Sequence, residues 1–317
     1  MDMIYHTLGN TGMRISRICF GASSLGSVFH DTREAESIEA VEAAIDGGIN
    51  FIDVSPYYGH YKAETVLGKA LVRIPREKYF LSTKVGRYGR DGVNTWDYSA
   101  RRAKESVYES MERLHVDHID LINVHDIEFQ AALPGGLQKL VDETLPALHE
   151  LKAEGVVNHV GITDLQLENL RWVIDHCAEG MVETVLNFCH YCLNDDALAD
   201  CLDYFESKGI GVINASPLGM GLLSSRGVPA WHPAPKALVD ACARAAALCR
   251  SRDYPIEKLA VQYSVSNPGI AGTLFSSSSP DNVRKNIAWA CEEPDWELVH
   301  EVQAVIGDQK RVTWANS

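Results

Sequence analysis

Short apolar segments alternate with longer segments of helical period along most of the chain. The short segments are rich in Val, Ile, Leu and Phe and are apolar on both faces, which is typical of parallel strands covered by helices. We expect eight such strands, at residues 18–21, 50–54, 79–84, 118–125, 158–163, 183–188, 211–216 and 272–276.

Each expected strand precedes a stretch of helical period. Several of these helices end at a glycine, namely Gly48, Gly155 and Gly209, as a left-handed C-cap requires. The helices are expected at residues 33–48, 64–72, 99–114, 143–155, 167–177, 196–209, 236–252 and 280–290. Consecutive strand–helix units without a break in composition favour an α/β fold, a closed (β/α)8 TIM barrel built as one domain over residues 1–317.

The segment before the first strand has a different pattern. Residues 5–16 predict a short N-terminal β-hairpin with its turn at residues 9–12, and we expect it to cover the floor of the barrel. The structural alternative is an open, doubly wound sheet. Such a sheet usually carries G-x-G-x-x-G after its first strand, and this sequence has none there.

Composition and charge narrow the class of function. Of the 317 residues, 46% are hydrophobic, which is enough apolar surface for a folded protein. The formal net charge is −14, and an acidic surface repels nucleic-acid backbones and anionic lipid. No apolar run approaches the roughly 20 residues of a membrane helix, and the N-terminus lacks the features of a secretory signal. We therefore expect a cytoplasmic enzyme acting on a small molecule, without nucleic-acid or membrane partners.

The sequence contains eight cysteines, two of them in a C-x-x-C pair. Without a signal peptide a disulfide framework is not expected. Cys189 and Cys192 form the pair after the sixth expected strand, a setting in which thioredoxin-type redox pairs also occur. A zinc site would need a second such pair, which the sequence lacks. Two reduced, packed thiols are the favoured interpretation, with a redox or metal role as the alternative.

Ionisable side chains gather where the expected strands end, which is where barrels of this type carry their active sites. Asp53 ends the second strand, Lys84 the third and His125 the fourth. Tyr58 lies in the loop that follows Asp53. An ammonium beside a phenol lowers its pKa, and a carboxylate keeps that ammonium charged and in place. With an imidazole to orient a substrate oxygen, such a set can move a proton on or off a carbonyl or alcohol while a cofactor moves a hydride.

Several motifs, in their order and spacing, resemble the aldo-keto reductase family over essentially the whole chain. They are NFIDVSPYYGHYKAE (50–64), STK (82–84), RLHVDHIDLINVH (113–125), VGIT (160–163) and INASPLGMGLL (213–223). The resemblance implies that Tyr58 is the proton-transfer residue and that Lys84 and Asp53 tune it. It also implies that His125 orients the substrate and that the reaction uses no metal.

The same resemblance implies a nicotinamide cofactor. Its carboxamide is expected near Thr163, Asp164 and Asn187, where the family more commonly has Ser-Asn and Gln. An aromatic ring often stacks on the nicotinamide, and Ala215 occupies that position here. The other expected cofactor-binding residues lie at strand ends and in the loops that follow: Gly21, Ala22, Ser216, Leu218, Gly219, Gly221, Ser276, Ser277, Ser278, Asn282 and Asn286.

Two of these positions bear on the choice of cofactor. Family members that prefer NADP usually place Lys and Arg near the adenosine ribose, and the matching residues here are Ser276 and Asn282. Neither can neutralise a phosphate dianion, so NAD is expected over NADP. Arg284 and Lys285 lie close enough in sequence to weaken this preference if their side chains turn toward the ribose.

The expected rim loops resemble those of sugar 1-dehydrogenases within the family, above all of the L-galactose type. The matching segments are GASSLGSVF (21–29), HDIEF (125–129), CHYCLND (189–195) and AWHPA (230–234). They predict oxidation of a pyranose at C1 to its lactone, with L-galactose as the expected sugar. Polar residues at or just past strand ends are expected to contact the sugar: Ser24, His60, Asp126 and His190, with Ser23, Ser27, Glu128 and Tyr191 as further candidates.

Other functions remain as alternatives. Within the same chemistry they are another sugar 1-dehydrogenase, a pyridoxal-type dehydrogenase or a general aldehyde reductase. A nucleotide-binding but non-catalytic protein, like the β-subunits of potassium channels, is the alternative from another class. Residues 22–26 also fit an A-x-S-x-G variant of the serine-hydrolase elbow, but they follow the first strand and no Asp/His order accompanies them.

Overall fold

The computed structural model describes residues 2–90 and 92–315, and eight of its strands close into a parallel barrel. Every predicted barrel strand is confirmed, with each boundary within one residue of its expected place. Around the barrel the order is β10-β11-β12-β3-β4-β5-β8-β9. The strands are β3 (Ile18–Gly21), β4 (Phe51–Asp53), β5 (Phe80–Val85), β8 (Ile119–Val124), β9 (Val157–Asp164), β10 (Thr184–Phe188), β11 (Gly211–Ala215) and β12 (Gly272–Ser276).

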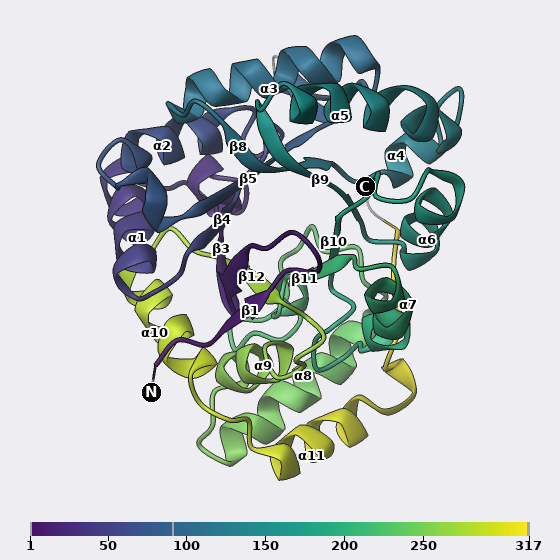
Figure 1. The fold of residues 1–317 in the computed structure, drawn as a ribbon. Helices are drawn as coiled ribbons and strands as arrows, with labels where there is room; N and C mark the ends of the chain where they lie inside the picture. The colour runs from purple at the N-terminus through teal and green to yellow at the C-terminus, as the bar shows by residue number, and fades with distance from the viewer. Residues whose placement is uncertain (1, 91, 316–317) are drawn as a thin grey trace.

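Helices surround the barrel as an outer ring (Figure 1). The predicted helices are α1 (Glu34–Asp46), α2 (Lys62–Leu71), α3 (Ala100–Leu114), α5 (Leu145–Ala153), α6 (Leu167–His176), α7 (Leu202–Ser207), α8 (Lys236–Ser251) and α10 (Pro280–Ala290). Helix α7 is shorter than predicted because its first part, Ala197–Cys201, is a 3-10 helix. The helices that the sequence pattern did not predict are α4 (Glu128–Ala131), α9 (Ile256–Ser264) and α11 (Trp296–Ile306).

The predicted glycine stops at helix ends are confirmed by the backbone. Gly48, Gly155 and Gly209 have φ values of 91°, 76° and 69°, in the region that side chains with a Cβ rarely adopt. In each case the glycine lets the chain leave the helix and turn toward the next strand.

The predicted N-terminal hairpin covers the floor of the barrel. Strands β1 (Tyr5–Thr7) and β2 (Arg14–Ser16) pair antiparallel, and β1 crosses the barrel end that faces the viewer in Figure 1. Apolar residues of the hairpin are fully buried in one cluster with the N-terminal parts of the strands. This cluster comprises Leu8, Met13, Ile15, Cys19, Phe51, Leu121, Leu186, Ile213, Ala271 and Leu274. The N-terminal end of the barrel is therefore closed by hydrocarbon.

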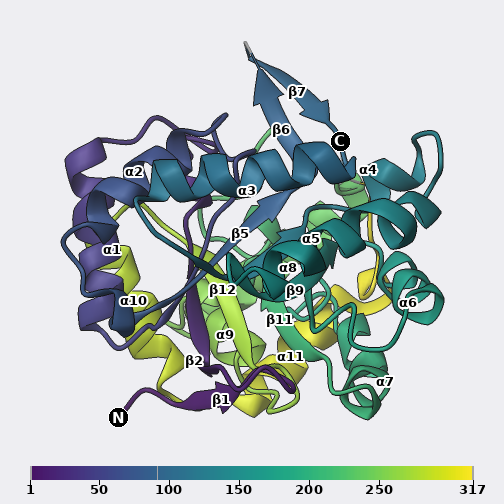
Figure 2. The ribbon, with the colours of Figure 1, turned by 45° about the horizontal axis from the view of Figure 1, so that its top comes forward.

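A second hairpin, which the sequence pattern did not predict, follows β5. Strands β6 (Arg87–Arg90) and β7 (Val93–Trp96) pair antiparallel and stand away from the barrel at the other end (Figure 2). Gly89 packs directly on the His60 ring, where an added Cβ would overlap the ring atoms. The hairpin thus packs against the loop after β4 and forms one wall of the barrel's C-terminal end. Within residues 2–90 and 92–315, no helix is both long and apolar enough to cross a membrane.

Candidate active site

The C-terminal ends of three adjacent strands bring Asp53, Lys84 and His125 together, as predicted. Strands β4, β5 and β8 are neighbours in the barrel, so residues at their ends share one rim. Lys84 Nζ donates to Asp53 Oδ1 and also to the carbonyl oxygen of Val54, at 2.9 Å. Ser82 Oγ donates to the other oxygen of Asp53 at 2.8 Å. Lys84 and Asp53 are 1% and 3% exposed, so this ion pair is shielded from solvent.

The loop after β4 turns back over this ion pair and carries Tyr58 to it. The turn depends on Gly59, which has φ +61° and whose Cβ position would overlap the backbone of Gly26. Lys84 Nζ lies 4.9 Å from the centroid of the Tyr58 ring. The ring meets that of His125 edge-on, with their centroids 5.6 Å apart. The four residues predicted as a catalytic set therefore form one cluster.

Burial dominates the electrostatics of Tyr58. It raises the pKa of the phenol to about 12, while the charge of Lys84 acts in the opposite direction. The sequence-based expectation of a lowered pKa is thus right about the effect of Lys84 but wrong about the net direction. Burial also acts to lower the pKa of Lys84, but the charges of Asp53 and Tyr58 outweigh it and raise that pKa. In the free protein near neutral pH, Tyr58 is a protonated phenol beside a permanent ammonium.

His125 is held as a neutral imidazole. Burial lowers its pKa well below the usual value, and the charges of Lys84 and Arg87 add to this effect. The hydroxyl of Ser55 lies 3.0 Å from Nδ1, and the backbone carbonyl of His125 accepts from Tyr98 Oη at 2.7 Å. Ser55 Oγ accepts from the Tyr57 N–H and can therefore give its own proton to Nδ1; in that tautomer Nε2 carries the imidazole proton and can donate to a substrate oxygen.

Of the four predicted substrate residues, Asp126 lies against the catalytic cluster. Its Oδ2 is 3.5 Å from His125 Nε2. Ser24 instead accepts a hydrogen bond from Ser276 Oγ at 2.8 Å, which ties two loops of the rim together. His60 contacts Asn94 of the second hairpin at 3.2 Å.

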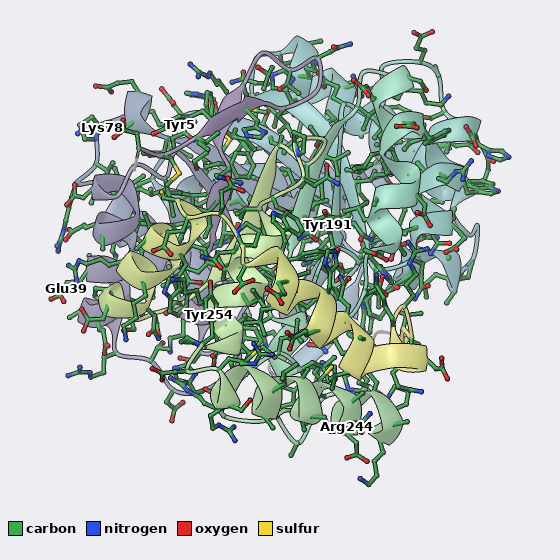
Figure 3. The ribbon with its side chains drawn as sticks, turned by 90° about the horizontal axis from the view of Figure 1, so that it is seen from below. Tyr5, Glu39, Lys78, Tyr191, Arg244 and Tyr254 are labelled. Carbon is green, nitrogen blue, oxygen red and sulfur yellow. The ribbon has the colours of Figure 1, made fainter. Side chains whose placement is uncertain are left out.

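The remaining predicted rim residues stabilise loops. His190 is buried and pairs with Asp195, with 2.9 Å between Nδ1 and Oδ2. Tyr191 is stacked on Tyr263 of α9 and lies in the interior in Figure 3, unlike the surface residue Glu39. The others are involved in local contacts or lie in the first loop: Ser27 accepts from Lys62 Nζ, Glu128 interacts with Asp164, and Ser23 begins the 3-10 turn Ser23–Gly26.

Sequence reasoning missed Arg87, which pairs with Asp126 next to His125. Its Nη1 donates to Asp126 Oδ2 at 2.5 Å, and its guanidinium carbon lies 3.7 Å from the centroid of the Tyr57 ring. The segment GRYGRDG that contains it has a pattern typical of an irregular loop. Its glycines and charged residues give no apolar alternation from which the short strand β6 could be predicted. Its place three residues after Lys84 is the one signal in the sequence that could have found it.

The predicted carboxamide-binding residues meet at the ends of β9 and β10. Asn187 Nδ2 donates to the backbone carbonyls of Asp164 and Leu165, at 2.8 and 3.0 Å. This leaves Asn187 Oδ1 buried without a partner among the described residues. The hydroxyl of Thr163 accepts from the backbone N–H of Asp126 and keeps its own proton to donate. An orphaned acceptor on β10 and a hydroxyl donor on the neighbouring strand β9 fit an amide group, as a nicotinamide carboxamide would require.

The other predicted cofactor residues line the rim from β11 to β3. Gly21 and Ser276 are register partners on neighbouring strands, followed by Ala22. Ser216, Gly219 and Gly221 have φ of 61°, 55° and 109°, and they give the loop after β11, with Leu218, its tight turns. Ala215 ends β11, so no aromatic ring is supplied from that position. Near the start of α10 lie Ser277, Ser278, Asn282 and Asn286.

The cysteines are free thiols, which agrees with the favoured interpretation of the C-x-x-C pair. Cys189 and Cys192 are both buried, and Cys192 Sγ donates to the Cys189 carbonyl at 3.1 Å. Burial raises the pKa of the Cys189 thiol to about 12, so it is a poor nucleophile and ligand. In the part of the chain that the structure describes, no cluster of three or more potential metal ligands occurs.

Comparison with known proteins agrees with this geometry. The family model described as "Aldo/keto reductase family" matches residues 17–305. L-galactose dehydrogenase of Arabidopsis thaliana is 45% identical over 313 residues, covering 97% of this chain and 95% of that protein. D-arabinose 1-dehydrogenase of Saccharomyces cerevisiae is 33% identical and covers 80% and 76% of the two chains.

A solved structure agrees as well. An aldo-keto reductase from Bacillus halodurans, in its holo form, superposes with a TM-score of 0.78 at 26% identity, covering 99% of this chain and 98% of the other. The family model spans nearly the whole barrel, and the predicted tetrad is assembled at the barrel's C-terminal end. The chain is therefore an oxidoreductase that belongs to the aldo/keto reductase family.

Proposed function

We propose that this protein is an NAD-dependent dehydrogenase that oxidises a pyranose at C1 to its lactone, with L-galactose as the substrate. The observation that carries the proposal is the buried cluster of Asp53, Lys84, Tyr58 and His125 in a chain 45% identical to an L-galactose dehydrogenase. Similarity to a D-arabinose 1-dehydrogenase supports the wider class, oxidation of an aldose at its anomeric carbon.

The mechanism assigns one task to each residue of the cluster. His125 donates from Nε2 to the C1 hydroxyl oxygen and fixes its position. Tyr58 takes the hydroxyl proton as the C1–H bond breaks and C1 becomes a carbonyl carbon. Lys84 offers positive charge to the phenolate form of Tyr58, and Asp53 holds Lys84 in place. When bound, the nicotinamide cofactor supplies the hydride acceptor.

Three residues at the ends of β9 and β10 would hold the nicotinamide end of the cofactor. The orphaned Asn187 Oδ1 would accept from its carboxamide N–H, and the Thr163 hydroxyl would donate to its carboxamide oxygen. Asp164 lies beside them, and its pKa is raised to about 9 by burial and by Glu128. Burial and Glu128 thus favour the protonated form of this carboxyl group, whose oxygens accept from the Gln166 N–H and from Asn169 Nδ2 at 3.2 and 2.8 Å.

NAD is the proposed cofactor, in preference to NADP, because neither of the two positions matched to the adenosine ribose carries a cationic side chain. Ser276 and Asn282 are neutral, and Ser276 is engaged with Ser24. Arg284 is exposed and paired with Asp281 of the same helix, with 3.1 Å between Nη1 and Oδ1. That carboxylate would repel a 2′-phosphate at this end of α10.

The anomeric carbon is the easiest position of a sugar to oxidise. Its ring oxygen stabilises the positive charge that develops as hydride departs. Sugar hydroxyls left unpaired in a dry pocket cost about 1–3 kcal/mol each, so each mismatched hydroxyl of an epimer should lower kcat/KM by about 5- to 150-fold.

A kinetic panel tests the proposal. Reduction of NAD or NADP is followed by the absorbance of the reduced nicotinamide, with L-galactose, L-fucose, D-galactose and D-glucose as substrates. We expect kcat/KM to be highest for L-galactose with NAD, lower for L-fucose, which lacks only the 6-hydroxyl, and lowest for the two D-sugars. A flat response to these sugars with fast turnover of simple aldehydes would show a general aldehyde reductase instead. A higher kcat/KM with NADP would refute the cofactor assignment alone.

A further inference from the structure

We propose that Arg87 and Trp96, on the β6–β7 hairpin, form a hydroxyl-binding wall that selects polyhydroxylated substrates over simple aldehydes. The inference rests on the proposed sugar dehydrogenase function and names the residues that would give it its substrate preference. It concerns a hairpin that contributes nothing to the barrel itself.

Arg87 lies directly beside the group that would hold the reacting oxygen. Its Nη1 and His125 Nε2 both approach the same atom, Asp126 Oδ2, at 2.5 and 3.5 Å. Arg87 and Asp126 are 6% and 4% exposed. A substrate bound to His125 by its C1 oxygen would therefore bring its next carbons against this ion pair.

The hairpin presents two buried donors that the described residues leave unused. Arg87 Nε and Trp96 Nε1 are both shielded from solvent and lack a hydrogen-bond partner within residues 2–90 and 92–315. The Phe129 ring contacts both side chains, with its centroid 4.5 Å from the Arg87 guanidinium carbon and 5.2 Å from the centroid of the Trp96 ring. Because buried N–H groups are nearly always paired in folded proteins, two orphans on one wall point to a ligand with acceptor oxygens.

The guanidinium is fixed before any substrate arrives. It stacks on the Tyr57 ring at 3.7 Å, and its hairpin is joined to the loop after β4 through Asn94 and His60. Asn94 Nδ2 also donates to Tyr57 Oη, at 3.4 Å. A donor held in this way loses little conformational entropy when it binds a hydroxyl.

The chemistry of the wall suits adjacent hydroxyl groups. The carboxylate of Asp126 accepts a hydrogen bond, while the neighbouring guanidinium and indole N–H groups donate hydrogen bonds. Two hydroxyls on neighbouring carbons can therefore use both kinds of group at once, and the rings of Tyr57 and Phe129 offer apolar surface for the sugar's C–H groups. An aldehyde without hydroxyls leaves the donors unpaired, which penalises it.

The test uses Arg87→Lys and Trp96→Phe in the full-length protein. Lysine keeps a positive charge beside Asp126 and so keeps His125 neutral, but it lacks the Nε donor and the planar fork. Phenylalanine keeps the Trp96 ring and removes only its N–H. For each variant, kcat and KM are measured for L-galactose oxidation, and for reduction of glyceraldehyde and of propanal, which has the same carbon chain without hydroxyls. The Kd of NADH and the Tm serve as structural readouts.

We expect Arg87→Lys to lower kcat/KM for L-galactose and glyceraldehyde by at least about 10-fold, mainly through KM. Propanal turnover should change less than about 3-fold. Trp96→Phe should shift selectivity in the same direction by a smaller factor. The matched control is Arg102→Lys, which alters an arginine stacked 4.4 Å from Tyr88 of the same hairpin and paired with Glu109. It should leave all three substrates within about 3-fold of wild type.

Equal losses for glyceraldehyde and propanal would overturn the inference, because they would show a structural role. Retained selectivity in both Arg87→Lys and Trp96→Phe would overturn it too. The proposed function has its own test, which does not involve the variants: it would be wrong if the wild-type protein oxidised none of the sugars. The glyceraldehyde-to-propanal ratio would then still test the wall.

Discussion

Phe51 and Asp53 lie two residues apart on β4, yet they belong to opposite ends of the barrel. Phe51 is fully buried in the hydrocarbon floor beneath the N-terminal hairpin. Asp53 is also buried, but it pairs with Lys84 at the rim. Burial of Phe51 stabilises the fold directly. Burial of the charged groups at the rim costs free energy, which is offset only because the two charges are paired and hydrogen-bonded. The same strand thus contributes to the apolar core at one end and to the ion pair of the candidate active site at the other.

Two tyrosines at opposite ends of β5 differ in the same way. Tyr79 precedes β5 at the floor, and Tyr58 lies over Lys84 at the far end of the same strand. Burial raises the pKa of both phenols. Of these two tyrosines, only Tyr58 has an ammonium and a neutral imidazole beside it, so position at the rim, and not burial alone, distinguishes the residue that we propose for proton transfer.

The largest expected effect comes from removing the proton carrier at the rim. Tyr58→Phe keeps the ring and should lower kcat by about 10²–10⁴-fold, the usual worth of acid–base catalysis. The Kd for NADH should stay unchanged. Tyr79→Phe is the control at the floor and should leave kcat unaltered. Wild-type turnover by Tyr58→Phe would refute the assignment.

A mutation at the floor should show the opposite profile. Phe51→Ala removes a fully buried ring and should lower the free energy of unfolding by about 3–5 kcal/mol, measured by urea denaturation. KM and kcat of the folded fraction should stay near wild type. The matched control is Val72→Ala, since Val72 is 64% exposed and should contribute little. If Phe51→Ala changed KM without loss of stability, the separation of the two ends would be wrong.

The pH dependence should report the raised pKa of Tyr58. Oxidation needs the unprotonated form, whose fraction rises with pH as long as the pH lies below that pKa, about 12 in the free protein. We therefore expect kcat/KM for sugar oxidation to increase by up to tenfold per unit from neutral to alkaline pH. Reduction needs protonated Tyr58, which is already the main form near neutrality. His125 stays neutral throughout, because its pKa is far below the range. An oxidation rate that fell as the pH rose would contradict this.

The smallest effect is expected for the buried thiols. Replacing Cys189 and Cys192 by Ala should leave kcat and KM unchanged and lower stability by about 1 kcal/mol each through lost packing. Wild-type activity should be the same with and without a thiol reductant. Activity that depended on the redox state of this pair would revive the redox interpretation.

Much of the fold could be predicted because barrel strands are apolar on both faces and their helices end at glycines such as Gly155 and Gly209. The candidate catalytic cluster could be predicted because the place of a residue at a strand end follows once the strand itself is placed correctly. Helix α11 could have been found, since Asp295 caps it through its side chain and marks its start. Helices α9 and α11 both lie outside the strand–helix alternation and so were missed.

The proposed hydroxyl-binding wall could not be predicted in the same way. Arg87 belongs to a four-residue strand rich in glycine and arginine, and such a segment has no apolar alternation to reveal it. Its importance comes from a contact with Asp126, 39 residues further along the chain. Asp126 itself was predicted because it follows His125, but its ion pair depends on how the hairpin folds over the rim.

The central claim is that hydride leaves C1 of L-galactose while Tyr58 takes the hydroxyl proton. L-galactose carrying deuterium at C1 tests it most directly, with NAD as acceptor and the reduced cofactor examined by NMR. The account predicts deuterium at C4 of the nicotinamide and L-galactonolactone as the product, with the transfer lost in Tyr58→Phe. Reduced cofactor without deuterium, or oxidation at another carbon, would contradict it.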